Sequence, residues 1–181
     1  MNIAKPMVAA ALAASVLLPT AAQAQPTDDL QATKAATARF HSIEQATASG
    51  YSELRDAAGI ACIDNPAGGM GIHYANGARV GDPALVPTSP EVLVYQPMPD
   101  GGLKLVALEY VILESTWRAG HPDPADVPSL FGQDFERLPG AGEAKPQNRY
   151  GLPAFYELHL WLWKPNASGM FSDWNPAVTC P

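Results

Sequence analysis

The stretch Leu103-Lys-Leu-Val-Ala-Leu-Glu-Tyr-Val-Ile-Leu113 decides the fold, because it is a long and almost wholly apolar run. A strand-like segment at 91–96 precedes it, and the turn at 97–102 between them contains Asp100-Gly101. This order of strand, turn and strand is typical of a β-hairpin. The sequence therefore predicts a hairpin whose second arm lies in the middle of a sheet.

A strand outside the hairpin is predicted by Phe155-Tyr-Glu-Leu-His-Leu-Trp-Leu-Trp163. Because side chains alternate between the two faces of a strand, Tyr156 and the leucines form an ordinary core face. The opposite face carries a carboxylate and an imidazole among aromatic rings, and its members are Phe155, Glu157, His159, Trp161 and Trp163. A row of this kind is typical of a pocket wall.

A helix is predicted near the N-terminus, before the hairpin. Thr27, Asp28 and Asp29 are typical of a helix start, and Ser49-Gly50 is typical of a helix stop. Apolar side chains between these limits repeat at helical spacing, at Ala32, Ala36, Phe40 and Ile43. We expect one amphipathic helix of about 20 residues here.

The remaining segments are mostly turns and loops, in a chain with 18 prolines and 15 glycines. Residues 64–71 are rich in Gly, Asn and Asp and predict a turn, which leads into a short strand at 72–76. A short helical turn is expected within 129–137. No repeat or linker divides the sequence. Residues 25–181 are therefore expected to form one α+β domain, with the N-terminal helix packed on an antiparallel sheet of about four or five strands.

Residues 1–24 have the pattern of an export signal that is removed. Lys5 is followed by an apolar stretch at 8–18, and Ala22-Gln23-Ala24 offers small residues for cleavage. No later stretch approaches roughly 18 consecutive apolar residues, so no membrane-spanning segment is expected after cleavage. The sequence thus predicts a soluble protein in a bacterial periplasm or outside the cell.

Two cysteines, Cys62 and Cys180, are the only ones in the chain. In an oxidising compartment they are expected to form a disulfide, although a pair of thiolate metal ligands is the alternative. The bridge would close a loop of more than a hundred residues, which contributes about 4 to 5 kcal/mol in the loop-entropy description.

The charge of the chain argues against nucleic acid as a partner. There are 18 Asp and Glu against 11 Lys and Arg, a formal net charge of −7. Binding to nucleic acid depends mostly on Lys and Arg that neutralise phosphates. An anionic membrane surface is disfavoured for the same reason.

Three residues are candidates for a metal site: His73, Glu109 and His159. Glu109 lies in the apolar run, where an unpaired carboxylate costs several kcal/mol. If the three strands share a sheet, the three side chains can converge on one face. Two imidazoles and a carboxylate bind zinc or iron in many proteins, and Glu157 would be a fourth ligand or would orient an imidazole.

Two alternatives stay open for the same residues. A buried network could merely satisfy its own hydrogen bonds, as in a structural envelope protein. A small apolar or carbohydrate-like ligand could instead bind against Tyr74, Trp161 and Trp163, with Phe155 in the wall. No familiar catalytic motif is present, so an enzyme would be a metal-dependent hydrolase or oxygenase.

The other histidines and two methionines are weaker candidates. His41 lies on the polar side of the predicted helix, and His121 lies in a Pro-rich loop from which it could reach the site. Met70 and Met170 stand near the candidate segments, and a mixture of His and Met ligands would suit copper. Core packing is the ordinary role of such methionines.

A resemblance to other proteins is found in three segments, Gly69-Met-Gly-Ile-His-Tyr74, Leu108-Glu-Tyr110 and Tyr156-Glu-Leu-His-Leu-Trp-Leu-Trp163. The chain resembles a group of small exported bacterial proteins to which no activity is assigned. The likeness runs from the predicted helix to Cys180. It implies a single exported domain, and it transfers no site residue.

Overall fold

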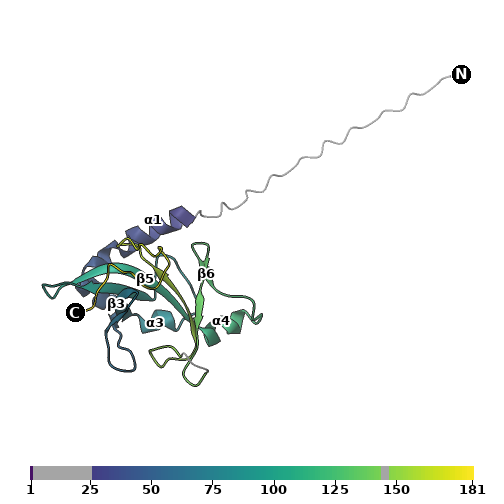
Figure 1. The fold of residues 1–181 in the computed structure, drawn as a ribbon. Coiled ribbons are helices and arrows are strands. Elements are labelled where there is room, and N and C mark those ends of the chain that lie inside the picture. Colours follow the sequence, from purple (N-terminus) through teal and green to yellow (C-terminus); the bar gives the residue numbers. More distant parts are fainter. Residues whose placement is uncertain (2–25, 144–146) are drawn as a thin grey trace.

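A computed structural model describes residues 1, 26–143 and 147–181 of the chain. The expected signal, apart from Met1, lies outside the described residues. Figure 1 shows the N-terminal helix beside a sheet and the C-terminal segment, in yellow, running back across the strands. Within the described residues, no helix combines the length and the apolar character that a bilayer crossing requires.

Seven antiparallel strands form the main sheet, in the order β1-β3-β4-β5-β9-β8, with β2 also paired to β3. Their bounds are β1 (Ser52–Glu53), β2 (Cys62–Asn65), β3 (Gly68–Ala75), β4 (Val92–Pro97), β5 (Leu103–Leu113), β8 (Glu136–Leu138) and β9 (Phe155–Leu160). The predicted α+β class, the central β5 and the hairpin are confirmed. The sheet exceeds four or five strands because short edge strands add to it.

The predicted single helix is in fact three pieces: α1 (Pro26–Thr37), the 3-10 helix η1 (Ala38–His41) and α2 (Ile43–Ala48). The break is at Ser42, whose backbone is extended and whose hydroxyl accepts a hydrogen bond from the Gln45 amide. Ser42 therefore caps a new helix. Two further short helices, α3 (Gly77–Val80) and α4 (Glu114–Gly120), were not predicted.

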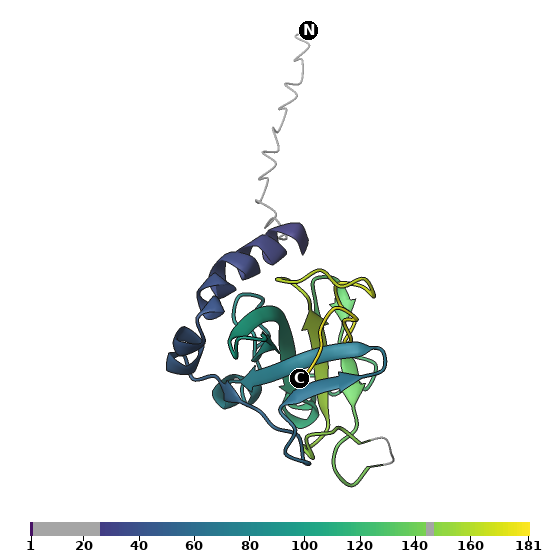
Figure 2. The same cartoon turned by 60° about the vertical axis from the view of Figure 1, so that its left-hand side comes forward.

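The two faces of the sheet bury different clusters. The face under the N-terminal helices, here called the helix face, packs Phe40, Tyr51, Leu93, Tyr95, Leu105, Leu108, Tyr110, Tyr156, Leu158 and Leu160. The opposite face, here called the site face, packs Val92, Val94, Ala107, Val111, Phe155, Trp161 and Val178. Figure 2 shows the helices running along one side of the strands. The side chains of His73, Glu109, Glu157 and His159 lie on the site face.

The glycine-rich segment at 64–71 is only partly a turn, because β3 begins at Gly68. Gly68 and Gly69 lie against the C-terminal segment, where a Cβ on Gly68 would stand 2.4 Å from the Asn175 carbonyl oxygen. The segment can therefore continue as a strand with another backbone directly upon it. The strand predicted at 72–76 is present, but it begins four residues earlier and ends one residue earlier than expected.

The predicted helical turn at 129–137 is wrong. This region forms the hairpin of β6 (Ser129–Leu130) and β7 (Gln133–Asp134), followed by β8. Phe131 and Gly132 both have positive φ, at 54° and 73°. Two successive residues of this kind make a tight hairpin turn rather than a helix.

The C-terminal segment folds back over the sheet after β9 ends at Leu160, three residues earlier than predicted. The Trp161 amide donates to the Met170 carbonyl, and the Asn175 amide donates to that of Gly69. Cys180 then forms the predicted disulfide with Cys62, across 118 residues of sequence. The extreme C-terminus is thereby fixed to β2.

Candidate functional site

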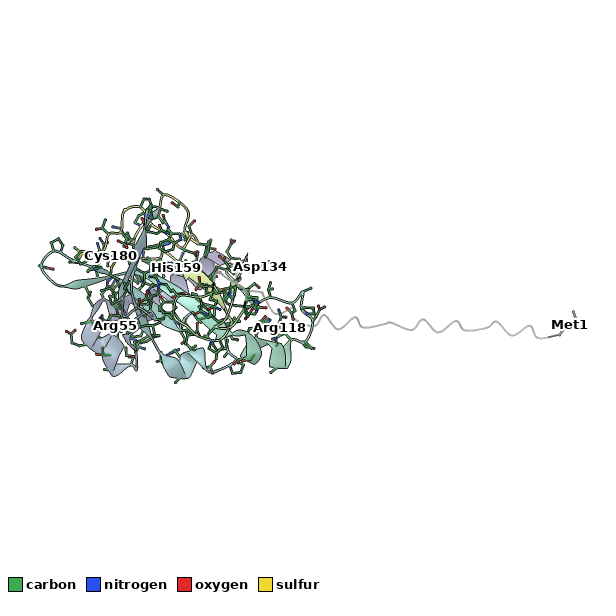
Figure 3. The ribbon with its side chains drawn as sticks, turned by 60° about the horizontal axis from the view of Figure 1, so that its bottom comes forward. Met1, Arg55, Arg118, Asp134, His159 and Cys180 are labelled. Atoms are coloured by element: carbon green, nitrogen blue, oxygen red, sulfur yellow. A yellow bond between two sulfur atoms is a disulfide. The ribbon has the colours of Figure 1, made fainter. Side chains whose placement is uncertain are left out.

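His73, Glu109, Glu157 and His159 gather in the interior of the site face. Their exposed fractions are 1%, 4%, 7% and 2%. In the antiparallel register Glu109 stands opposite His159, and Val111 opposite Glu157. His73 comes from β3, which is separated from β5 by β4. Figure 3 labels His159 near the middle of the molecule.

The distances within this group are short. The Nε2 atom of His73 lies 3.5 Å from Oε2 of Glu109. The ring centroids of His73 and His159 are 6.3 Å apart. The Glu157 carboxyl lies near that of Glu109, because burial first and then the charge of Glu109 raise the pKa of Glu157. We refer to these four side chains as the His–Glu cluster.

Both imidazoles of the cluster lack hydrogen-bond partners. All four ring nitrogens of His73 and His159 are buried without one. The approach of His73 to Glu109 is within ion-pair distance, yet it does not meet the geometry of a hydrogen bond. Buried polar atoms are satisfied in the great majority of cases, and each unsatisfied one costs about 1 to 3 kcal/mol.

Burial sets the protonation of the cluster. Burial, and then the positive charge of Arg149, lower the pKa of His73 to about 4. Burial, and then the neighbouring His73, lower the pKa of His159 to about 3. Burial also raises the pKa of both Glu109 and Glu157 above the ordinary range. The imidazoles are therefore neutral at pH 7, and each has a lone pair free to bind a cation or accept a proton.

Apolar and aromatic side chains enclose the cluster. The Trp161 ring lies 4.9 Å from that of His159, and the Tyr150 ring lies 6.1 Å from that of His73. The Trp161 indole nitrogen donates to the Ser172 carbonyl, which fixes the ring under the C-terminal segment. Phe155 packs on the same face. Such walls keep water away and strengthen the electrostatic interactions inside.

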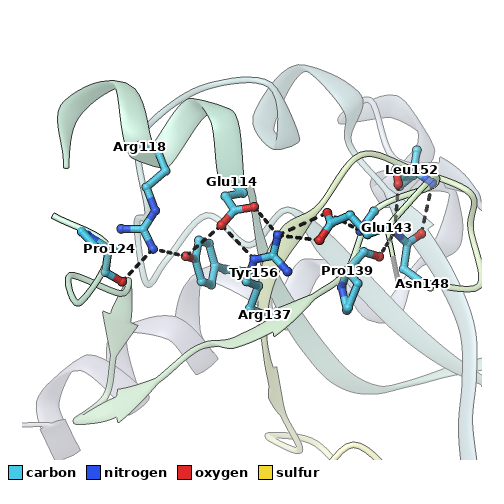
Figure 4. Close-up of polar contacts among 10 residues, drawn as sticks. Glu114, Arg118, Pro124, Arg137, Pro139, Glu143, Asn148, Leu152 and Tyr156 are labelled. Carbon is cyan, nitrogen blue, oxygen red and sulfur yellow. Dashed lines mark hydrogen bonds and ion pairs between the residues drawn. The ribbon is translucent and has the colours of Figure 1, made fainter. Parts of the chain in front are cut away.

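The segments that cover the cluster are held by polar contacts, shown in Figure 4. Arg137 of β8 pairs with Glu114 of α4 at 2.6 Å and with Glu143 at 3.0 Å. Asn148 donates to the Pro139 and Leu152 carbonyls and accepts from the Leu152 amide. These contacts tie the segments 139–143 and 147–153 to the sheet. Tyr150 is thereby positioned above His73.

Two cavities reach the cluster from an acidic side. One, of about 180 Å³, is lined in part by Glu109, Glu157 and Asp173. The other, of about 150 Å³, is lined in part by His159, Glu157 and Asp173. Burial, and then the charge of Glu136, raise the pKa of Asp173. Arg149 also lines the larger cavity, so a cation that meets only carboxylates among charged side chains enters by the smaller one.

Several residues named from the sequence lie elsewhere. Tyr74 follows His73 directly, so it points to the helix face, where its ring packs on Tyr95. Trp163 also packs on the helix face, under Lys34 and beside His41. Neither aromatic ring is a wall of the cluster, because alternation separates Tyr74 from it and the end of β9 separates Trp163 from it.

The remaining histidine and the two methionines have separate positions. His121 stacks on Trp117 at the end of α4 and lines neither acidic cavity. Met70 is buried and lines the larger of these cavities beside Glu109. Met170 is exposed.

Tyr150, Asp173 and Glu91 are polar residues that sequence reasoning missed. Tyr150 and Asp173 lie in irregular segments, where no periodicity indicates which side chains face inward. Glu91 directly precedes β4, is 2% exposed, and accepts a hydrogen bond from the Val111 amide. An acidic residue at the start of an apolar strand was the available signal for Glu91.

Comparisons with known proteins add no identity: no protein-family model, curated protein or solved structure matches the chain. In the part of the chain that the structure describes, no three His, Cys, Asp or Glu side chains stand in ready metal-ligand geometry. The His–Glu cluster and the cavities beside it are therefore the features of the molecule that bear on its function.

Proposed function

We propose that this is an exported protein that binds one divalent first-row transition metal ion through His73, His159 and Glu109. Glu157 is the fourth member of the site, as a further ligand or as a partner that orients the others. The observation that carries the proposal is the set of four buried imidazole nitrogens without partners, beside two buried carboxyls. The expected leader and the Cys62–Cys180 disulfide support export.

Charge supports a divalent cation in this position. Two neutral imidazoles and two carboxylates would together hold two negative charges, which a divalent ion neutralises. Buried carboxylates are costly unless they are paired or bind a metal. A site of two imidazoles and one carboxylate with one position open is the donor set of several catalytic zinc sites, and iron also uses it.

Ligation requires the two imidazole rings to move closer together. With metal–nitrogen bonds of about 2.0 Å, two imidazoles on a tetrahedral metal have ring centroids about 5 Å apart, and only near-linear ligation extends this distance to about 6.4 Å. The 6.3 Å between the rings of His73 and His159 is therefore about 1 Å longer than a tetrahedral site needs. Two ligand atoms of one metal lie about 3 to 4 Å apart, as do His73 Nε2 and Glu109 Oε2 at 3.5 Å. The rings must turn to bring their nitrogens toward one point.

The test is elemental analysis of untagged protein purified from its export compartment, beside a His159→Ala variant. We expect about one equivalent of metal in the parent and its loss in the variant. The matched control is His121→Ala, because His121 stacks on Trp117 outside the cluster. This control should keep the metal.

A second measurement tests the proposal on the parent protein alone, in case the His159→Ala variant fails to fold. Titration of the metal-free parent with Co²⁺ should give the visible absorption of a low-symmetry site with nitrogen and oxygen ligands. A parent that contains no metal and binds neither Zn²⁺ nor Co²⁺ overturns the proposal.

A further inference from the structure

A third cavity, of about 260 Å³, lies on the site face next to the His–Glu cluster. It is bounded by α3, by the end of β5 and by residues 150–152. Its walls are mostly aliphatic and aromatic, and they include Val80, Val92, Val111, Leu113, Leu152 and Phe155. Apolar side chains normally close upon one another, so a space of this size between them favours an apolar occupant.

Glu109 connects this apolar cavity to the cluster. Its side chain lines the apolar cavity and also the 180 Å³ cavity on the acidic side. Tyr150 likewise lines both. Glu109 supplies the one carboxyl among the residues that line the apolar cavity, and it is 4% exposed. The apolar space therefore ends at the proposed metal site.

The other end of the cavity opens at α3. Gly77 and Gly81 line this end, and both are exposed. A Cβ on Gly77 would meet no atom within 4 Å. These two positions carry no side chain that could close this end of the cavity.

We propose that this cavity binds a small apolar molecule with a single hydroxyl group, which points to Glu109 and the metal. The inference rests on the proposed function for the metal end of the cavity. A cavity of about 150 Å³ holds benzene, so one of this size fits a molecule of about ten non-hydrogen atoms. A substituted single-ring phenol has that size.

The chemistry of the walls selects the end group. A hydroxyl donates to the Glu109 carboxylate, and its oxygen can occupy the open position on the metal. Because Glu109 and Glu157 already neutralise a divalent ion, a free carboxylate on the ligand would bring an uncompensated negative charge into a buried space. The apolar walls offer no partners for a second polar group, which would be buried at a cost.

Calorimetric titration with para-propylphenol and with propylbenzene tests the inference on the metal-loaded parent. A hydrogen bond to a charged group contributes about 1.5 to 3 kcal/mol, so the phenol should bind about ten- to a hundredfold more tightly than the hydrocarbon. Val80→Trp places an indole at the opening and should abolish binding. Ala78→Trp, at an exposed position of α3 outside the cavity lining, is the matched control and should bind like the parent.

The outcomes separate this inference from the metal proposal. A metal-loaded parent that binds neither probe, or that binds both equally, overturns the inference and leaves the metal site intact. His159 does not line the apolar cavity, so His159→Ala should bind the phenol more weakly without loss of the hydrocarbon. A parent that binds neither Zn²⁺ nor Co²⁺ and still prefers the phenol refutes the proposed function, while it supports the cavity as a ligand site.

Discussion

The His73 Nε2 atom lies 3.5 Å from Glu109 Oε2, although the two residues belong to strands that do not pair with each other. The contact crosses β4 on the site face, where β4 presents Val92 and Val94. In the register His73 stands beside Val94, and Glu109 beside Val92, so the two polar side chains meet diagonally over short aliphatic residues. Larger residues at these two positions would separate the imidazole from the carboxyl.

Metal removal should lower the stability of the parent protein and leave the stability of the His159→Ala variant unchanged. A ligand present at about a hundred times its dissociation constant stabilises the native state by about 2.7 kcal/mol. For a domain of this size that corresponds to a fall in Tm of about 5 to 10 °C on chelation. Differential scanning calorimetry with and without a chelator measures it. Equal shifts in the parent and the variant would contradict ligation by His159.

The Glu91 carboxyl should make stability decline with rising pH. Burial raises the pKa of Glu91 from 4.5 to about 8, against the smaller lowering effect of hydrogen bonds from backbone amides. The folded state then holds the proton more tightly than the unfolded state. This contribution to stability is complete below pH 4.5 and is lost as the pH rises through about 8.

Glu91→Gln removes this dependence while it keeps an acceptor for the Val111 amide. We expect the variant to gain on the order of 2 to 4 kcal/mol relative to the parent between pH 4.5 and pH 8. Urea denaturation across that range measures the difference. Glu53→Gln on the exposed strand β1 is the control. A constant difference between Glu91→Gln and the parent at every pH would show that titration of Glu91 is not the cause.

Gly68→Ala should be one of the most destabilising small substitutions in the chain. Gly68 has a φ of 137°, and a Cβ there would lie 2.4 Å from the Asn175 carbonyl oxygen. Backbone strain and overpacking each cost about 1 to 3 kcal/mol, so a total above about 3 kcal/mol is expected.

Gly101→Ala is the matched control for this prediction. Gly101 also has positive φ, at 83°, but a Cβ there meets no atom within 4 Å. Its expected cost is the strain alone, about 1 kcal/mol. Urea midpoints compare the two variants. Similar losses at both positions would mean that the approach of the C-terminal segment is not tight.

Replacing both cysteines, Cys62→Ala with Cys180→Ala, should lower the free energy of unfolding by about 4 to 5 kcal/mol. The bridge spans 118 residues of sequence, so its removal frees a long loop in the unfolded state. A thiol reductant should lower the Tm of the parent to about that of the double variant and leave the double variant unaffected. A parent whose Tm is insensitive to the reductant would show that the bridge contributes little.

Local patterns in the sequence predicted the parts of the fold that short-range chemistry determines. Leu103–Leu113 is a strand with the predicted bounds, because its apolar run and the Asp100-Gly101 turn are local signals. Alternation in 155–160 predicted which side chains share a face with His159. The breaks at Ser42 and at Phe131-Gly132 were not predicted, because they depend on individual backbone conformations that no periodicity reveals.

The sequence by itself determined which residue types could form a site: two histidines and two glutamates in apolar strands, where burial demands a partner. Tertiary structure alone decided that β4 lies between His73 and Glu109, that Tyr150 covers them, and that an apolar cavity adjoins Glu109. The physical reason is that strand order and loop placement result from packing between segments far apart in the chain. Alternation fixes the face of each side chain, whereas only the assembled sheet fixes its neighbours.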